Sequence, residues 1–163
     1  MTANKNILID IQLDEKTIGR NTPDIEQERD IAIFDLLEDN HFELVNRQGK
    51  PPVEGPYKLT LSQEDKRLVF TISDIDNKTL AVHNLSLTPF KTVIKDYFLI
   101  CESYFEAIKT ATPERIEAID MGRRGLHNEG SELLMNRLKE KITLDKPTSR
   151  RLFTLITALH WKG

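Results

Sequence analysis

The stretch DMGRRGLHNEGSELL, residues 120–134, holds the side chains of this chain that are best suited to bind an anion or to move a proton. Two adjacent arginines can form paired hydrogen bonds with a carboxylate or a phosphate, and a histidine or a glutamate can act as a general acid or base. The anion-binding candidates are Arg123, Arg124, His127 and Asn128, and the acid–base candidates are His127, Glu129 and, from an earlier segment, His83.

The glycines of this stretch, from Gly122 to Gly130, allow two backbone conformations. In the first, a helix ends near Met121, the glycines form a loop, and the free N–H groups of a new helix beginning near Asn128 cradle an anion. In the second, one helix continues through the stretch, and glycines on its buried stripe let another helix approach closely. We favour the continuous helix, because its apolar residues keep helical phase on both sides of the glycines.

Even in a continuous helix, the charged side chains of this stretch need partners. Arg123 and His127 are four residues apart and share a face, as do Arg124 and Asn128. The patch therefore either binds an anion or forms structural ion pairs with acidic groups of the same fold or of a second subunit, and ion pairs are the commoner arrangement.

His83 lies in the segment TLAVHNLSL, in phase with two apolar neighbours of a predicted strand. This phase predicts a partly buried imidazole with a hydrogen-bond partner rather than a general base. His83 and Lys95 would contribute to the candidate site only if the fold brings them to His127.

Motifs for metals, nucleotides and hydrolytic nucleophiles are absent from the sequence. Without HExxH or EF-hand spacing we expect no metal, and without GxGxxG, P-loop or GxSxG patterns no cofactor is indicated. The single cysteine, Cys101, lies in the apolar run FLICESYF, where a reactive thiolate is disfavoured. Whether the protein is an enzyme stays open.

Composition and charge predict one cytoplasmic domain spanning residues 1–163. The chain has 39% hydrophobic and 30% charged residues, which is typical of an ordered, well-solvated protein. Secretion is not indicated by the segment MTANKNILIDIQL, and because the apolar stretches are short and interrupted by charge we expect no membrane span. The net charge is −3, with the acidic excess in the first half, so we expect no nucleic-acid partner. The lysines and arginines of residues 137–151 are interpreted first as a solvated face, and RNA binding through them is the third functional hypothesis.

The elements that must position these residues follow from periodicity and capping. Residues 7–13 alternate as a strand, and three further strands between residues 57 and 87 form an antiparallel meander. Thr-Pro pairs predict helix starts at Thr22, Thr88 and Thr112, and a last helix closes the chain. The predicted fold class is α+β, with an antiparallel sheet of four to five strands, helices on one face and a helical C-terminal half.

Several long segments, including IGRNTPDIEQERDIAIFDLLE and ATPERIEAIDMGRRGLHNEGSELLMNRLKEKI, resemble uncharacterised protein family 0262, an alphaproteobacterial family. The resemblance covers nearly the whole chain. It implies a bacterial cytoplasmic protein of this length, and it brings no activity, cofactor or catalytic residue.

The leading functional hypothesis is a binding, adaptor or regulatory module that acts through its C-terminal helices. The helix from Phe90 to Ile108 is apolar over more than half its circumference, which predicts that it is central and favours a homo-oligomer or a protein partner. The alternative is an enzyme or sensor for a small phosphorylated or carboxylated metabolite that uses Arg123 to Glu129.

Overall fold

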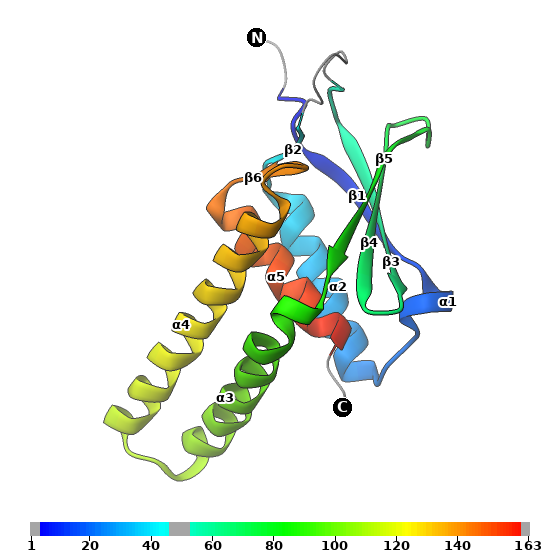
Figure 1. Ribbon diagram of the computed structural model, residues 1–163. Helices are drawn as coiled ribbons and strands as arrows, with labels where there is room; N and C mark the ends of the chain where they lie inside the picture. Colours follow the sequence, from blue (N-terminus) through cyan, green and yellow to red (C-terminus); the bar gives the residue numbers. More distant parts are fainter. Residues whose placement is uncertain (1–3, 46–52, 161–163) are drawn as a thin grey trace.

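The computed structural model describes residues 4–45 and 53–160, which fold as α+β (Figure 1). A four-stranded sheet has the order β1-β3-β4-β5, and a separate two-stranded sheet pairs β2 with β6. The strands are β1 (Leu8–Leu13), β2 (Phe42–Leu44), β3 (Tyr57–Glu64), β4 (Arg67–Ser73), β5 (Thr79–Ser86) and β6 (Ile142–Leu144).

The predicted antiparallel meander is present, but the sheet as a whole is mixed. Strands β3, β4 and β5 pair antiparallel, whereas β1 pairs parallel with β3, with Ile11 opposite Leu59. The predicted antiparallel arrangement therefore holds for β3, β4 and β5, and only the β1 edge departs from it. A parallel pair requires a crossover connection, and the chain between β1 and β3 supplies one that includes a long helix.

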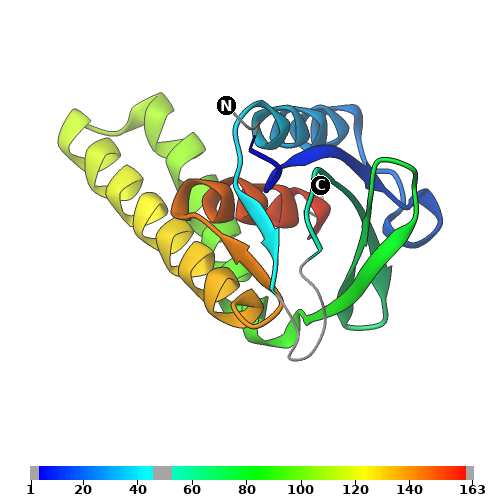
Figure 2. The ribbon, with the colours of Figure 1, turned by 90° about the horizontal axis from the view of Figure 1, so that it is seen from above.

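Helices α2 and α5 cover one face of the large sheet (Figures 1 and 2). Along β3, Tyr57, Leu59 and Leu61 are buried and alternate with half-buried residues, so only one side of the sheet faces the core. The side chains of α5 complete that core, with Phe153 and Leu155 fully buried. The helices are α1 (Glu15–Ile18), α2 (Pro23–Glu38), α3 (Lys91–Thr110), α4 (Pro113–Leu138) and α5 (Lys146–His160), with the 3-10 turn η1 (Thr88–Phe90) before α3.

Helices α3 and α4 form an antiparallel hairpin that extends away from the rest of the molecule (Figure 1). The prediction that the Phe90 to Ile108 helix is central holds only for its first turns, where Val93 and Ile94 are buried. Farther along α3, Leu99, Phe105 and Ile108 are exposed. That expectation is wrong for the outer part of the hairpin, because α4 covers only one side of α3 there.

Two of the three predicted Thr-Pro helix starts have the expected capping geometry. The hydroxyls of Thr22 and Thr112 accept hydrogen bonds from the backbone N–H groups three residues later. Thr88 differs, because it is the first residue of the turn η1, whose N-cap is Leu87, and no capping hydrogen bond from the Thr88 hydroxyl is found among the described residues. There Leu87 still donates to the carbonyl of Lys66, so the end of the sheet sets the local conformation.

Candidate functional site

Residues 113–138 form one continuous helix, α4, through the whole glycine and arginine stretch. A Cβ atom on Gly130 would overlap the ring of Phe153 in α5, and one on Gly122 would lie 2.7 Å from Cδ1 of Ile100 in α3. The two glycines thus let neighbouring helices approach, as the continuous-helix interpretation predicts. The loop interpretation is wrong, and with it the cradle of free N–H groups, since these groups are bonded within the helix.

Both arginines of the stretch bind one carboxylate on their own helix. Arg123 donates from Nε and Nη2 to Oδ1 of Asp120, and Nε of Arg124 lies 3.3 Å from Oδ2. The Arg123 guanidinium also lies over the ring of Tyr104 in α3, 4.4 Å from its centroid. These contacts support the ion-pair interpretation of the arginines and leave about one positive charge uncompensated.

His127 lies between α3 and α5, with its ring centroid 5.6 Å from that of Tyr97 and 5.3 Å from that of Phe153. Its Nε2 is 2.7 Å from Oγ1 of Thr154, and that hydroxyl already donates to the carbonyl of Arg150. With the hydroxyl donating in this way, the neutral tautomer that fits is the one in which Nε2 donates and Nδ1 is deprotonated, and no hydrogen-bond partner for Nδ1 is found among the described residues.

Protons are hard to move in this cluster near neutral pH. Burial, reinforced by Arg150 and Arg123, lowers the pKa of His127 to about 4, and burial raises the pKa of Tyr97 to about 12. Burial also raises the pKa of the Cys101 thiol, which shares a hydrogen bond with Tyr97. These groups stay neutral between pH 6 and 8, which suits a structural cluster better than acid–base catalysis.

The other predicted site residues lie apart from this cluster. Asn128 and Glu129 are exposed on α4, and His83 is buried in the large sheet, where it pairs with Phe70 of β4. Lys95 is two residues from Tyr97 on α3, so the two side chains point in nearly opposite directions. Lys95 lines a different feature, a cleft at the base of the hairpin.

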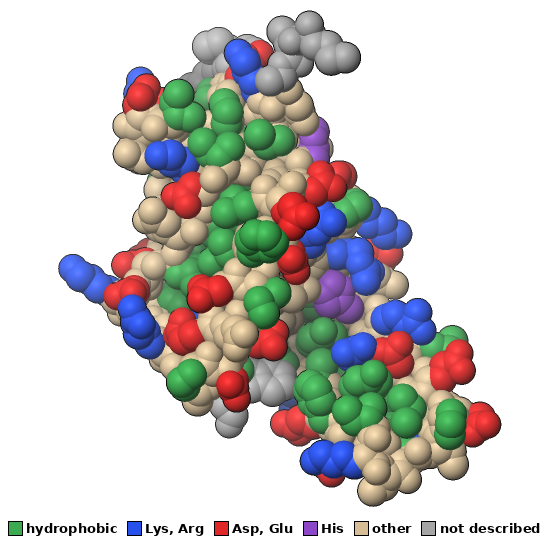
Figure 3. Space-filling view, turned by 180° about the vertical axis from the view of Figure 1, so that it is seen from behind, with side chains coloured by type: hydrophobic (Ala, Val, Ile, Leu, Met, Phe, Trp, Pro, Cys, Tyr) green, Lys and Arg blue, Asp and Glu red, His purple; other side chains and the backbone are tan. Residues whose placement is uncertain are grey.

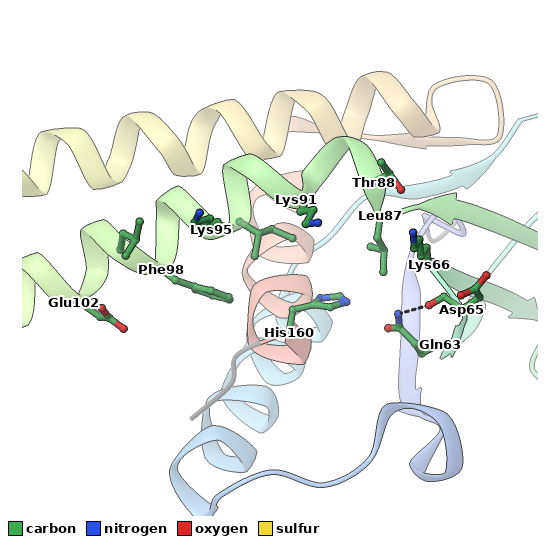
Figure 4. Close-up of a pocket in the computed structure, with 12 residues that line it drawn as sticks. Gln63, Asp65, Lys66, Leu87, Thr88, Lys91, Lys95, Phe98, Glu102 and His160 are labelled. Atoms are coloured by element: carbon green, nitrogen blue, oxygen red, sulfur yellow. Dashed lines mark hydrogen bonds between the residues drawn. The ribbon is translucent and has the colours of Figure 1, made fainter.

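This cleft has a volume of about 740 Å³ and lies between α3, the β3–β4 turn and the C-terminal end of α5 (Figure 4). Figure 4 shows Lys91, Phe98 and His160 pointing into it, with Lys66 at the opposite rim. The lining residues are Gln63, Asp65, Lys66, Leu87, Thr88, Lys91, Ile94, Lys95, Phe98, Leu99, Glu102 and His160.

Local structure explains how the polar groups reach the cleft. Asp65 adopts a left-handed φ of 56° in the tight β3–β4 turn, which turns Lys66 toward α3. Lys91 and Lys95 are one helical turn apart on α3 and share its cleft face. Nδ1 of His160 lies 2.8 Å from the carbonyl of Ile156, which fixes the imidazole at the end of α5.

Charge and apolar surface are combined in the cleft. Three lysines face two carboxylates there, and no ion pair of the described residues involves any of the five groups. The floor is apolar, with Leu87, Ile94, Phe98 and Leu99. Such a surface can bind an anion that carries an apolar group.

One feature of the sequence indicates the cleft. Lys91, Lys95 and Phe98 repeat at a helical spacing on a face separate from the one that meets α4. Their partners on the β3–β4 turn and at the end of α5 are distant in sequence, and no local pattern connects them.

No group of three or more His, Cys, Asp or Glu side chains within residues 4–45 and 53–160 has the arrangement of a metal site. Within the same residues, no helix is long and apolar enough to cross a membrane.

Comparison with known proteins gives a consistent family relationship. The model of Uncharacterised protein family (UPF0262) matches residues 5–162. A UPF0262 protein of Rhizobium meliloti is 59% identical over 164 residues, covering 100% of each chain. One from Mesorhizobium japonicum is 58% identical and one from Brucella canis 57% identical, each over 96% of this chain and 94% of the relative. No solved structure matches the chain. The chain belongs to Uncharacterised protein family (UPF0262), whose members among these relatives are bacterial.

Proposed function

We propose that this protein is a cytoplasmic binding protein for a small amphipathic anion, which it holds in the cleft between α3, the β3–β4 turn and the end of α5. The observation that carries the proposal is the combination of an apolar floor with three lysines that have no ion-pair partner among the described residues, in a cleft of about 740 Å³. This volume lies in the range of small-molecule sites, roughly 300–1,000 Å³.

The lysines favour a carboxylate or phosphate head group. Lys66 approaches from the sheet, and Lys91 and Lys95 from α3, so an anion between them meets ammonium groups on two sides. The Thr88 hydroxyl, which is not used as a helix cap, lines the same end of the cleft and can donate a hydrogen bond. Lysine binds an anion as a point charge, so this arrangement selects charge more strongly than head-group shape.

The apolar floor favours a ligand with a hydrocarbon or aromatic part. Phe98 and Leu99 continue the cleft along α3 beyond Lys95, and the exposed Phe105 lies two helical turns after Phe98. Each methylene buried on this surface contributes about 0.8 kcal/mol at most. A longer tail therefore raises the affinity while the head group stays at the lysines.

The cleft supports anion binding better than the cluster of Arg123, Arg124 and His127 does. The two arginines are bound to Asp120, whereas the cleft lysines have no ion-pair partner among the described residues. A catalytic role for the arginine cluster would also need a group that titrates near neutral pH, and the pKa of His127 is lowered to about 4. Binding without chemistry is therefore the function proposed.

The test is isothermal titration of the purified protein with sodium butyrate, sodium octanoate, octyl phosphate and, as an uncharged analogue, octanol. We expect octanoate and octyl phosphate to bind, octanoate up to about 200-fold more tightly than butyrate because it has four more methylenes, and octanol much more weakly than either. Loss of one charge-assisted contact in Lys91→Met should weaken octanoate binding about 10-fold or more.

The matched control is Lys109→Met, which removes an exposed lysine from the same helix outside the cleft. It should bind octanoate as the parent does. The proposal fails if none of the anions binds, or if Lys91→Met and Lys109→Met have equal affinities.

A further inference from the structure

The outer face of α2 is acidic along its whole length. Six exposed carboxylates, which we call the acidic strip, lie on this helix and its C-terminal cap: Asp24, Glu28, Asp30, Asp35, Glu38 and Asp39. The only lysine or arginine of α2, Arg29, is buried and binds the carbonyls of Gly19, Ala158 and Leu159. The strip therefore has no cation of its own helix beside it.

The acidic strip also forms no direct ion pair with other parts of the described chain. None of its carboxylates takes part in an ion pair of the described residues. Asp35, Glu38 and Asp39 lie at the C-terminal end of α2, where the helix dipole disfavours negative charge and where the last turn has no basic residue. These carboxylates lower the stability of the monomer, because they repel one another and the helix C-terminus. This indicates that another molecule supplies the cations that neutralise them.

Two large apolar side chains lie within the acidic strip. Ile31 and Phe34 are 48% and 66% exposed, and Phe34 is the most exposed large apolar side chain of the described residues. At 100° per residue, both share the outer face of α2 with Asp35 and Glu38. An aromatic anchor inside a charged rim is the usual composition of a protein–protein contact.

A basic surface lies beside the strip on the same side of the molecule. We call it the basic face, and its residues are Arg123 and Arg124 of α4 and Lys146, Arg150 and Arg151 of α5. Nη1 of Arg151 donates to the carbonyl of Asp39, so the two surfaces adjoin at the end of α2. Figure 3 shows acidic side chains gathered over α2 and basic ones next to them over α4 and α5.

We infer that this surface is the interface of a homodimer, in which the acidic strip of each copy docks on the basic face of the other. A two-fold axis near the junction of α2 and α5 makes both contacts at once, because each copy contributes one half of each pair. Phe34 and Ile31 then become covered by the partner.

A second copy fits this surface better than a nucleic acid does. The basic face carries five cations and the neighbouring Asp120, whereas six carboxylates adjoin it, so a phosphate backbone would be repelled by the strip. A second copy satisfies both surfaces, and its net charge of −3 adds only a small overall repulsion. The cleft proposed for the anion is lined by other residues, so the dimer does not depend on it.

The experiment is sedimentation velocity of the full chain at low and high salt, with charge-reversed variants. We expect the parent to be a dimer at 50 mM salt whose dissociation constant rises at least 10-fold at 500 mM. Asp35→Lys with Glu38→Lys should be monomeric, and so should Arg124→Glu with Lys146→Glu. An equimolar mixture of the two variants should restore a dimer, and native mass spectrometry should identify it as the heterodimer.

The control carries the same change of charge elsewhere, in Asp76→Lys with Glu117→Lys, both exposed and outside the two surfaces. It should dimerise as the parent does, and circular dichroism should show that all variants are folded. A monomeric parent at low salt overturns the inference, as does a mixture that stays monomeric. Binding of RNA by a monomeric parent, lost in Arg124→Glu with Lys146→Glu, would instead assign the basic face to nucleic acid.

Discussion

Alanine substitution at the glycines of α4 distinguishes a helix that is packed closely at defined positions from one that is merely tolerant of glycine. Gly125 and Gly130 lie in the interior of the same helix. By helix propensity alone, replacing either with alanine should raise the free energy of unfolding by about 1 kcal/mol. The two positions differ in what the new methyl group meets. At Gly125 the methyl group would have no described atom within 4 Å apart from its chain neighbours and the backbone of its own helix, whereas at Gly130 it would overlap three ring carbons of Phe153.

The expected magnitudes follow from this difference. Gly125→Ala should be more stable than the parent by the full difference in helix propensity, about 1 kcal/mol in the free energy of unfolding. For Gly130→Ala, the Phe153 ring is fully buried, so moving it out of the way displaces other core side chains, and the overpacking cost should be near 3 kcal/mol, the upper end of its usual range. The propensity gain offsets part of this cost, so Gly130→Ala should lower the free energy of unfolding by about 2 kcal/mol. Gly122→Ala should be nearly neutral, because its methyl group meets only the terminal carbon of Ile100, which can rotate.

The assay is urea unfolding followed by circular dichroism, with thermal melts in parallel. At this chain length, 1 kcal/mol corresponds to about 2–4 °C, so Gly125→Ala should raise Tm by that amount and Gly130→Ala should lower it by about 4–8 °C. Phe153→Leu should recover part of the loss in the Gly130→Ala background, with a coupling of about 1 kcal/mol or more. Equal stabilities of Gly125→Ala and Gly130→Ala would refute the close contact between α4 and α5.

Three further predictions concern buried polar groups. Folding lowers the pKa of His127 from about 6.5 to about 4, so between these pH values the unfolded chain binds a proton that the folded chain does not. The free energy of unfolding, measured by urea titration, should therefore fall from pH 7 to pH 5. The fall should be less steep in His127→Gln. An NMR titration in which the His127 ring protonates near pH 6.5 would contradict this. The Cys101 thiol, buried and with a raised pKa, should react with iodoacetamide at pH 8 much more slowly in the folded than in the urea-unfolded protein. Arg29→Ala should cost about 2–4 kcal/mol in urea unfolding, since three backbone carbonyls lose a charged donor, and an unchanged midpoint would show that these bonds contribute nothing.

Where the deciding interaction is local, the sequence was sufficient to predict the structure. Thr22 and Thr112 cap their helices through their own side chains, and alternation along β3 is set by the side-chain period of a strand. The continuity of α4 was also predictable, because apolar phase is retained on both sides of Gly122 and Gly130. Thr88 shows the limit, since the same Thr-Pro signal gives only a 3-10 turn where a strand end constrains the preceding residue.

Where the deciding interaction is distant, the sequence was insufficient. The parallel pairing of β1 with β3 depends on the path of the intervening helix, and a strand's own residues do not specify its neighbour. The short strand β6, residues 142–144, exists because β2 pairs with it. The cleft combines residues from 63–66, from 87–102 and residue 160, and His127 contacts Thr154, which is 27 residues away in the sequence.

The cleft and the proposed dimer surface use different cations, and this separation makes the two proposals independent. Lys66, Lys91 and Lys95 line the cleft, whereas the basic face belongs to α4 and the start of α5. Lys91→Met should therefore leave sedimentation unchanged, and Asp35→Lys with Glu38→Lys should leave octanoate affinity unchanged. If the monomeric variant instead lost affinity, the hairpin that carries α3 would have to move when the interface forms. The interface would then set the shape of the cleft, and ligand binding would depend on protein concentration, which the same titrations at two concentrations would reveal.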